Sequence, residues 1–296
     1  MITPEQLRGT GVALVTPFTP EKEVDFRALE NMINFVIDNR VDFLVILGTT
    51  AETATLTEKE QQLVVNTVIR INNGRVPLIL GMGGNNTAKV VDTINKTDFE
   101  GIDAILSVTP YYNKPNQEGL YLHYKEISLA SPVPIVLYNV PSRTGTNLES
   151  ATTLQLAREF DNIIAVKEAS GNFIQIMDLI KNRPKDFLVL SGDDATTFPL
   201  VTLGGDGVIS VIANAFPLEF SQMVRDALNE DLNKSKAMHF RFTDIIKDLF
   251  IEGNPAGIKA LLNVRGLVEN ELRLPLVTVS RETFIKLKQQ MEEFYR

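Results

Sequence analysis

The sequence predicts an α/β protein, a closed (β/α)8 TIM barrel with a C-terminal helical extension. Short, β-branched apolar runs recur along the chain as far as residue 211, and most of them are separated by amphipathic helical patterns. The runs are apolar on both faces, which is typical of a parallel sheet that helices cover on both sides. About eight such units fit one closed barrel.

The apolar runs define the expected strands, at 11–15, 41–47, 76–81, 104–108, 134–138, 163–166, 187–190 and 207–211. Apolar residues at helical spacing predict the first helix over 25–40. Thr57 and Glu60 form a capping box that opens the second helix. Asn86 is a plausible N-cap for the third.

The strand-like runs stop beyond residue 213, and helical patterns follow at 217–228, 232–250, 255–264 and 281–295. We therefore expect two parts, a catalytic barrel at 1–216 and a helical extension at 217–296. A doubly wound open sheet is the alternative fold, but its nucleotide-binding fingerprint is incomplete. The stretch GMGGNN at 81–86 lacks the last glycine, and GTGVAL at 9–14 precedes a strand.

Composition excludes several classes of function. A net charge of −8 repels phosphate backbones, so nucleic acid is not an expected partner. No stretch approaches the roughly 20 apolar residues of a membrane span, and the N-terminus lacks a signal segment, so we expect a cytoplasmic protein. There is no cysteine, and only His123 and His239, both in amphipathic segments, supply imidazoles. Catalysis must therefore draw on Lys, Tyr, Thr, Ser or carboxylates.

Lys167 directly follows the apolar run 163–166 and precedes a polar turn. Burial favours the neutral amine over the ammonium, and a neutral amine can attack a carbonyl to form a Schiff base. A lysine at a strand end can also extend its ammonium to solvent or pair with Glu168. The residues that follow the other strands decide between these interpretations.

Hydroxyls, tyrosines, glycines and charges follow almost every expected strand. In a (β/α)8 barrel these strand ends converge on one face, where such enzymes build their active sites. Turn geometry explains many of the Gly, Ser, Thr and Asp residues, but it does not explain Tyr138, Tyr112, Arg143 or Lys167. An amine to form an imine, phenols to move protons and a guanidinium to hold a carboxylate suit carbon–carbon bond chemistry on an oxo-acid.

A metal-dependent aldolase would instead polarise the carbonyl with a divalent cation, usually through several histidines, which this chain lacks. Asp193 and Asp194 could ligate Mg²⁺, but helix capping is the expected role for a pair that follows Ser191 and Gly192. We expect neither a metal nor another cofactor.

Five motifs resemble, in order, those of dihydrodipicolinate synthases: GTTAE at 48–52, TPYYNKP at 109–115, YNVPSRTG at 138–145, KEA at 167–169 and SGDD at 191–194. The resemblance runs from about Gly9 to Arg273, nearly the whole chain. It implies a lyase of lysine and diaminopimelate biosynthesis that condenses pyruvate with L-aspartate 4-semialdehyde without a cofactor. It also implies a homo-oligomer, in most cases a tetramer built from dimers.

The resemblance implies catalytic roles at four positions. Lys167 matches the lysine that forms the Schiff base with pyruvate, and Tyr138 matches the central proton donor and acceptor. Thr49 and Tyr112 match the relay partners of that tyrosine. In the family the Tyr112 equivalent is supplied across a subunit interface, so a complete site requires at least a dimer.

Four further positions match substrate-binding residues of the family. Thr50 and Ile209 look like the pyruvate-binding positions and use backbone groups, and Gly192 lines the pocket. Arg143 matches the arginine at the mouth of the site that receives the carboxylate of the semialdehyde.

Related enzymes and one non-enzymatic function remain as alternatives. N-acetylneuraminate lyase and sugar-acid aldolases share the barrel and the lysine, but SRTG at 142–145 and YYNKP at 111–115 favour the synthase. A barrel that binds an oxo-acid without catalysis would not form a covalent adduct with pyruvate.

Lysine-inhibited members of the family bind lysine near the positions of Thr53, Ala54, Glu58, Gln61, Asn85, Lys89 and Tyr111. Several of them carry histidine at the positions of Glu58 and Gln61 and glutamate at that of Lys89. Here Lys89 places a cation where the ammonium of the ligand needs an anion. We therefore expect weak or absent inhibition by lysine.

Overall fold

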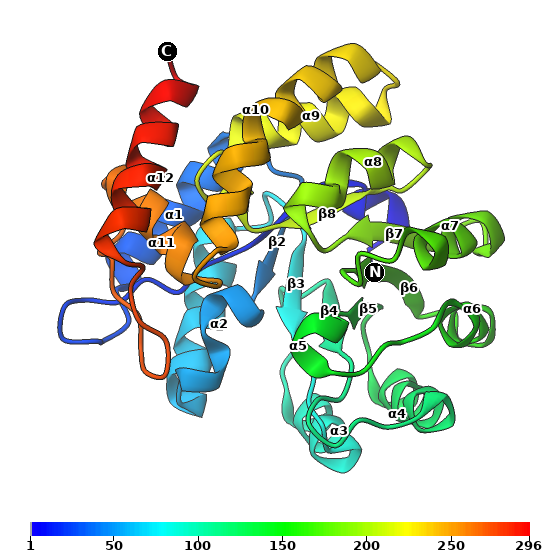
Figure 1. Cartoon of the computed structure of the whole chain (residues 1–296). Helices are drawn as coiled ribbons and strands as arrows, with labels where there is room; N and C mark the ends of the chain where they lie inside the picture. Colours follow the sequence, from blue (N-terminus) through cyan, green and yellow to red (C-terminus); the bar gives the residue numbers. More distant parts are fainter. Residues whose placement is uncertain (1) are drawn as a thin grey trace.

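The structure is a computed structural model that describes residues 2–296. Its parallel strands pair in sequential order, and β8 pairs with β1, so the sheet closes into a barrel (Figure 1). The predicted (β/α)8 fold is confirmed, and each strand overlaps one of the expected apolar runs. The strands are β1 Gly9–Ala13, β2 Phe43–Ile46, β3 Leu78–Gly81, β4 Ala104–Val108, β5 Ile135–Asn139, β6 Ile163–Glu168, β7 Leu188–Ser191 and β8 Gly207–Ser210.

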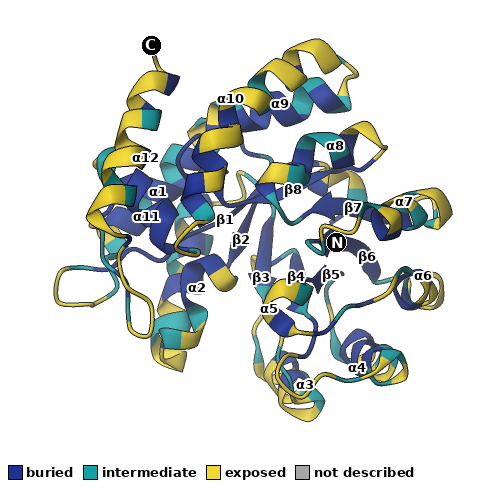
Figure 2. Cartoon of the chain, in the orientation of Figure 1, coloured by how far each residue is buried: buried dark blue, intermediate teal, exposed yellow. Residues whose placement is uncertain are grey.

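Helices connect the strands and cover the outside of the barrel with their buried faces inward (Figure 2). Side-chain caps set where several of them begin. Asp25 accepts from the N–H of Ala28, and Thr57 and Glu60 form the predicted capping box. The helices up to β8 are α1 Phe26–Asp38, α2 Glu58–Asn72, α3 Thr87–Lys96, α4 Gln117–Ala130, α5 Pro141–Thr144, α6 Ser150–Glu159, α7 Phe173–Asn182 and α8 Thr197–Thr202.

Alternation along the strands produces two apolar layers. In β2, Phe43 and Val45 belong to the cluster inside the barrel, whereas Leu44 and Ile46 belong to the cluster between the sheet and the helices. A Cβ on Gly11 would come within 2.0 Å of the Phe43 ring, so glycine leaves the space that this ring fills. The barrel interior is therefore a packed core, and only the carboxyl ends of the strands are available for chemistry.

The helices after β8 are α9 Pro217–Leu228, α10 Leu232–Phe250, α11 Ala256–Val264 and α12 Arg281–Phe294. In Figure 1, α10, α11 and α12 lie together on one side of the barrel, near α1. Phe216 anchors them, with its ring centroid 5.6 Å from that of Phe242 and 4.8 Å from that of Phe294. Because α9 contacts β1 and β8 as well as α10, it connects the two parts, and the division at residue 217 stays a prediction.

No helix within residues 2–296 is long and apolar enough to cross a membrane.

Candidate active site

Lys167 lies in β6, and the strand register directs its side chain into the barrel. It pairs with Tyr138 of β5 and Leu190 of β7, which both belong to the interior cluster. Lys167 is only 5% exposed, and its Nζ lies 4.3 Å from the centroid of the Tyr138 ring. A lysine that extends its ammonium to solvent would be exposed at that group. Because Lys167 is buried, its amine instead lies inside the carboxyl end of the barrel.

Glu168 follows Lys167 in β6 and therefore points to the opposite face of the sheet. Its buried carboxylate accepts hydrogen bonds from the backbone N–H of Ser170 at 2.7 Å, from Asn139 Nδ2 at 3.1 Å and from Gln175 Nε2 at 3.2 Å. Glu168 thus ties the turn after β6 to α7 and to β5. The pairing of Lys167 with Glu168 that the sequence left open is not formed.

Gly192 leaves room for the stem of Lys167. It follows β7, and its N–H donates to the carbonyl of Glu168 at 2.8 Å. A Cβ at Gly192 would lie 3.1 Å from both Cγ and Cε of Lys167 and 2.7 Å from Cβ of Ala169. Real Cβ atoms essentially never come within 3.0 Å of another carbon, as the contact with Ala169 would require, and the two contacts with Lys167 are tight as well. A side chain here would therefore displace the turn or the lysine.

Tyr138 and Ile209 complete the part of the site that the strands build. Tyr138 ends the interior face of β5, and Ile209 holds an equivalent place in β8. Both are buried in the same interior cluster. The fold therefore brings Tyr138, Lys167 and Ile209, three residues from separate strands, to one end of the barrel interior.

Thr49 and Thr50 begin a short 3₁₀ turn, η2 Thr49–Ala51, directly after β2. Thr49 is exposed, whereas Thr50 is 3% exposed. Oγ1 of Thr50 accepts a hydrogen bond of 2.9 Å from Nδ2 of Asn254. Thr50 is thus fixed from the C-terminal part of the chain, and Thr49 is exposed at the carboxyl end of β2.

Tyr112 lies on a loop and Arg143 in a short helix, and both residues are exposed in the single chain. Tyr112 is 89% exposed and has a left-handed backbone with φ of 72°. Its loop is held by Asn85, whose Nδ2 donates to the carbonyl of Tyr111 at 3.1 Å. Arg143 lies in the short helix α5. Within residues 2–296, no hydrogen bond joins either side chain to Lys167 or Tyr138.

Asp193 and Asp194 have separate structural roles. Asp193 caps the 3₁₀ turn η4 Asp194–Thr196 by accepting from the N–H of Ala195, as the sequence predicted. Asp194 is buried and accepts from the backbone N–H groups of Val211 and Ile212, at 3.1 and 2.8 Å. Burial raises the pKa of Asp194 to about 6. The carboxyl group therefore holds the loop that follows β8 and Ile209.

A second buried lysine, Lys259 of α11, was missed by the sequence analysis. Its side chain and that of Glu52 are both 0% exposed, and the Nζ to Oε1 distance is 2.5 Å. Asn254, which donates a hydrogen bond to Thr50, was not identified from the sequence either. The sequence held one signal, because Lys259 is a single cation within the apolar stretch AGIKALL at 256–262.

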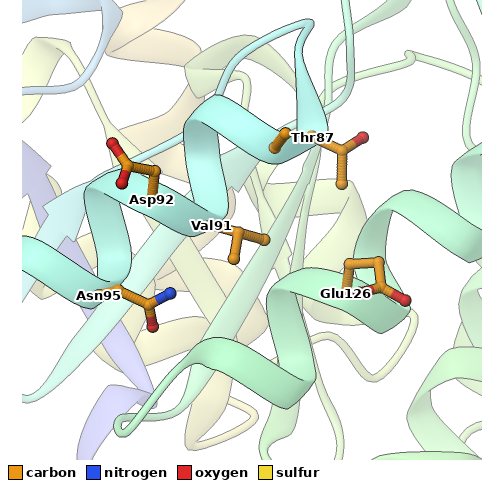
Figure 3. Close-up of a pocket in the computed structure, with 6 residues that line it drawn as sticks. Thr87, Val91, Asp92, Asn95 and Glu126 are labelled. Atoms are coloured by element: carbon orange, nitrogen blue, oxygen red, sulfur yellow. The ribbon is translucent and has the colours of Figure 1, made fainter.

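A groove of about 460 Å³ lies between α3 and α4 on the outside of the barrel (Figure 3). It is lined by Thr87, Ala88, Val91, Asp92, Asn95 and Glu126. None of the predicted site residues lines it, so the strand ends, not this groove, define the candidate active site.

A buried lysine that touches a tyrosine ring, at the carboxyl end of a (β/α)8 barrel, defines the class of protein: an imine-forming lyase. Residues 6–294 match the family model described as "Dihydrodipicolinate synthetase family". The chain belongs to this family.

Individual relatives agree with the family model. The chain is 55% identical to a 4-hydroxy-tetrahydrodipicolinate synthase of Parabacteroides distasonis over 97% of both chains. It is 40% identical to the crystal structure of dihydrodipicolinate synthase from Thermotoga maritima, with a TM-score of 0.95 over 97% of this chain and 98% of the other. A structure described as the first monomeric dihydrodipicolinate synthase variant is also 40% identical, with a TM-score of 0.96 over 100% and 99% of the two chains.

Proposed function

We propose that this chain condenses pyruvate with L-aspartate 4-semialdehyde through a Schiff base on Lys167, as a 4-hydroxy-tetrahydrodipicolinate synthase of the cytoplasm. The observation that carries the proposal is the buried amine of Lys167, which lies 4.3 Å from the Tyr138 ring centroid. Membership of the family supports the choice of substrates over those of the sugar-acid aldolases.

Lys167 acts as the nucleophile. Its neutral amine attacks the C2 carbonyl carbon of pyruvate, and the carbinolamine loses water to give an imine. The imine then loses a proton from the C3 methyl group, and the resulting enamine attacks the aldehyde carbon of the semialdehyde. The amino group of the semialdehyde next attacks C2, which closes the ring and releases Lys167 as the free amine.

Tyr138 moves the protons of these steps. The phenol next to Lys167 protonates the departing hydroxyl of the carbinolamine and recovers a proton from a later intermediate. Thr49 and Tyr112 pass that proton between Tyr138 and the mouth of the site. A relay is useful because the reference pKa of tyrosine, about 10, makes direct exchange of its proton with water slow.

The carboxylates of both substrates bind to groups at the strand ends. Backbone groups of Thr50 and Ile209 hold the carboxylate of pyruvate, and Gly192 leaves the adjoining wall open. Arg143, exposed at the mouth, binds the carboxylate of the semialdehyde.

Trapping with borohydride tests the nucleophile. The protein is incubated with pyruvate and sodium borohydride, and the intact mass and the peptide map are measured. We expect a gain of one reduced pyruvate per chain on Lys167 and no gain in Lys167→Ala. An unlabelled wild-type protein, or a labelled Lys167→Ala variant, contradicts the proposal. Coupled turnover with aspartate semialdehyde, compared with cleavage of N-acetylneuraminate, then tests the choice of substrate.

We also propose that the chain works as a homo-oligomer, a tetramer built from dimers, in which Tyr112 completes the site of a partner. The exposure of Tyr112, 89% in the single chain, supports this arrangement. Lys167→Ala and Tyr112→Phe chains are mixed, dissociated and reassociated. Hybrid dimers then contain one site with both native residues, so activity should exceed the sum of the two separate variants. Hybrids that form by native mass spectrometry without regained activity place Tyr112 in its own chain's site.

A further inference from the structure

A buried ion pair connects the candidate site to the C-terminal helices. Lys259 of α11 and Glu52, which follows η2, are separated by 207 residues in sequence and are both fully buried. Nζ of Lys259 donates to Oε1 of Glu52 at 2.5 Å and to the carbonyl of Glu271 at 2.9 Å. It also lies 4.1 Å from the centroid of the Phe18 ring.

Stability alone does not explain this pair. Removing two charges from water is costly, and replacing a buried ion pair with apolar residues of similar volume is often neutral or stabilising. A buried pair does, however, fix the positions of the two segments that carry it, because a separated charge would remain without a partner. The question is therefore which segment the pair fixes.

Glu52 belongs to the turn that presents Thr49 and Thr50. Its backbone is left-handed, with φ of 54°, between η2 and η3 Thr53–Thr55. For a residue other than glycine this conformation costs about 1 kcal/mol or more, so contacts of the side chain must hold it. The second carboxylate oxygen, Oε2, accepts from the backbone N–H of Arg273 at 3.0 Å.

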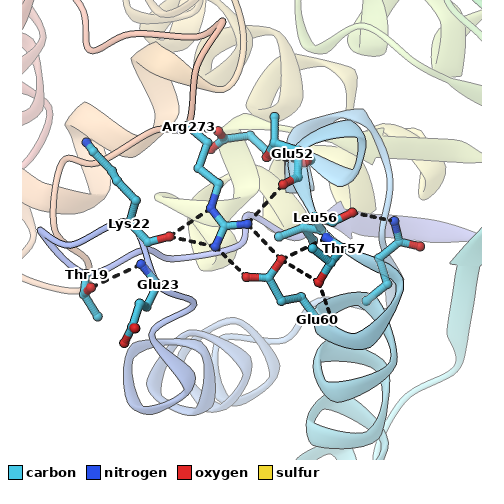
Figure 4. Close-up of polar contacts among 10 residues, drawn as sticks. Thr19, Lys22, Glu23, Glu52, Leu56, Thr57, Glu60 and Arg273 are labelled. Atoms are coloured by element: carbon cyan, nitrogen blue, oxygen red, sulfur yellow. Dashed lines mark hydrogen bonds and ion pairs between the residues drawn. The ribbon is translucent and has the colours of Figure 1, made fainter.

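Two further contacts from the C-terminal part hold the same turn, one of them from Arg273, which Figure 4 shows with its partners Lys22 and Glu60. Asn254 donates to Oγ1 of Thr50, and Nη1 of Arg273 donates to the carbonyl of Thr55 at 3.0 Å. Arg273 also forms an ion pair with Glu60 in the first turn of α2. The segment 48–55 is thus fixed at its beginning, middle and end by residues that follow the barrel.

We infer that Lys259 is a positioning residue: through Glu52 it holds the turn 48–55 so that Thr49 and the backbone of Thr50 face Lys167. This inference rests on the proposed roles of Thr49 and Thr50. It gives the C-terminal helices a part in substrate binding, although neither Lys259 nor Glu52 touches the substrate.

The test compares four variants with the wild type: Lys259→Met, a double variant, a matched control and the conservative Lys259→Arg. Lys259→Met removes the cation and shortens the side chain by one atom, and Glu52→Gln combined with Lys259→Met removes both charges. Arg183→Met is the matched control, because the Arg183–Asp206 pair is largely buried and joins the end of α7 to the start of β8, at the other end of the barrel. Thermal unfolding, the pyruvate concentration that gives half-maximal borohydride trapping, and amide hydrogen exchange of residues 48–55 are measured.

For Lys259→Met we expect a lower unfolding temperature, faster exchange of residues 48–55 and about a tenfold higher half-trapping concentration, because small displacements of positioning groups are costly. The double variant should recover most of the unfolding temperature, but its exchange of residues 48–55 should stay fast and its half-trapping concentration should stay high. Arg183→Met should lower the unfolding temperature but leave the exchange of residues 48–55 and the half-trapping concentration as in the wild type. Lys259→Arg should regain part of the pyruvate affinity.

Two results would overturn the inference. If the double variant regains wild-type trapping together with its stability, the pair is only structural. If exchange of residues 48–55 is the same in Lys259→Met as in the wild type, the pair does not hold the turn. The exchange measurement needs no substrate, so it remains decisive even if the wild type forms no pyruvate adduct, an outcome that contradicts the proposed function itself.

Discussion

Gly192→Ala is the substitution that most directly tests the geometry around Lys167. The added methyl group would lie 2.7 Å from Cβ of Ala169 and 3.1 Å from Cγ and Cε of Lys167. Carbon atoms pack best at about 3.5–4.0 Å, so the contact with Ala169 is about 1 Å too short. Either the turn after β6 or the lysine stem has to move.

The cost of either movement, in stability and in rate, can be estimated. Overpacking of this kind costs about 1–3 kcal/mol of stability. A misplacement of a reacting group by about 1 Å can slow a reaction by as much as a hundredfold. We therefore expect imine formation in Gly192→Ala to be slower by about tenfold to a hundredfold, while the mass of the final adduct on Lys167 is unchanged.

The assay is a time course of pyruvate trapping, quenched with borohydride and read by intact mass, next to a urea unfolding curve. Gly74→Ala is the control. Its φ of 71° makes alanine strained, but a Cβ there meets no atom within 4 Å, and the residue lies between α2 and β3, at the far end of the barrel. It should lose about 1 kcal/mol and trap at the wild-type rate. Wild-type trapping by Gly192→Ala would refute the placement of Gly192 against the lysine stem.

Three other predictions follow from the polar residues around the barrel. Burial raises the pKa of Asp194 from 3.8 to about 6, so the folded protein holds this proton more tightly than the unfolded chain does. The contribution of Asp194 to stability therefore falls as the pH rises from about 4 to 6. Between pH 4 and pH 7, the free energy of unfolding of Asp194→Asn should rise relative to that of the wild type by about 2 kcal/mol. Parallel pH profiles of the two proteins in urea unfolding would contradict this. Glu168→Gln should lower the free energy of unfolding by about 1–3 kcal/mol, because the partners of Glu168 are all donors. It should keep its pyruvate affinity, since Glu168 faces away from Lys167. A large loss of affinity would contradict this and show that the two residues are coupled through the strand. Lysine should inhibit only at high concentration because of the Lys89 cation, so strong inhibition at micromolar lysine in a turnover assay would disprove the expectation.

The sequence predicted those features that depend on local period and strand order. The apolar runs located the strands, and polar residues directly after them marked the end of the barrel at which Lys167 and Tyr138 meet. Alternation along a strand also places Lys167 and Glu168 on opposite faces. The sequence left open whether those two residues pair, because it did not show whether the strand ends before Glu168. In the structure β6 continues through Glu168, so the two side chains point to opposite faces.

Contacts between distant segments could be decided only by the tertiary structure. Asn254 lies 204 residues from Thr50, and Lys259 lies 207 residues from Glu52. No periodic pattern encodes such distances, because they depend on how α11 packs against the barrel. By itself the sequence thus determined the barrel, its lysine and the chemistry that the lysine suggests. Packing alone decided that Lys167 is buried beside Tyr138 and that the turn carrying Thr49 and Thr50 is held from the C-terminal helices, since burial and pairing of charges arise only when segments far apart in the chain meet.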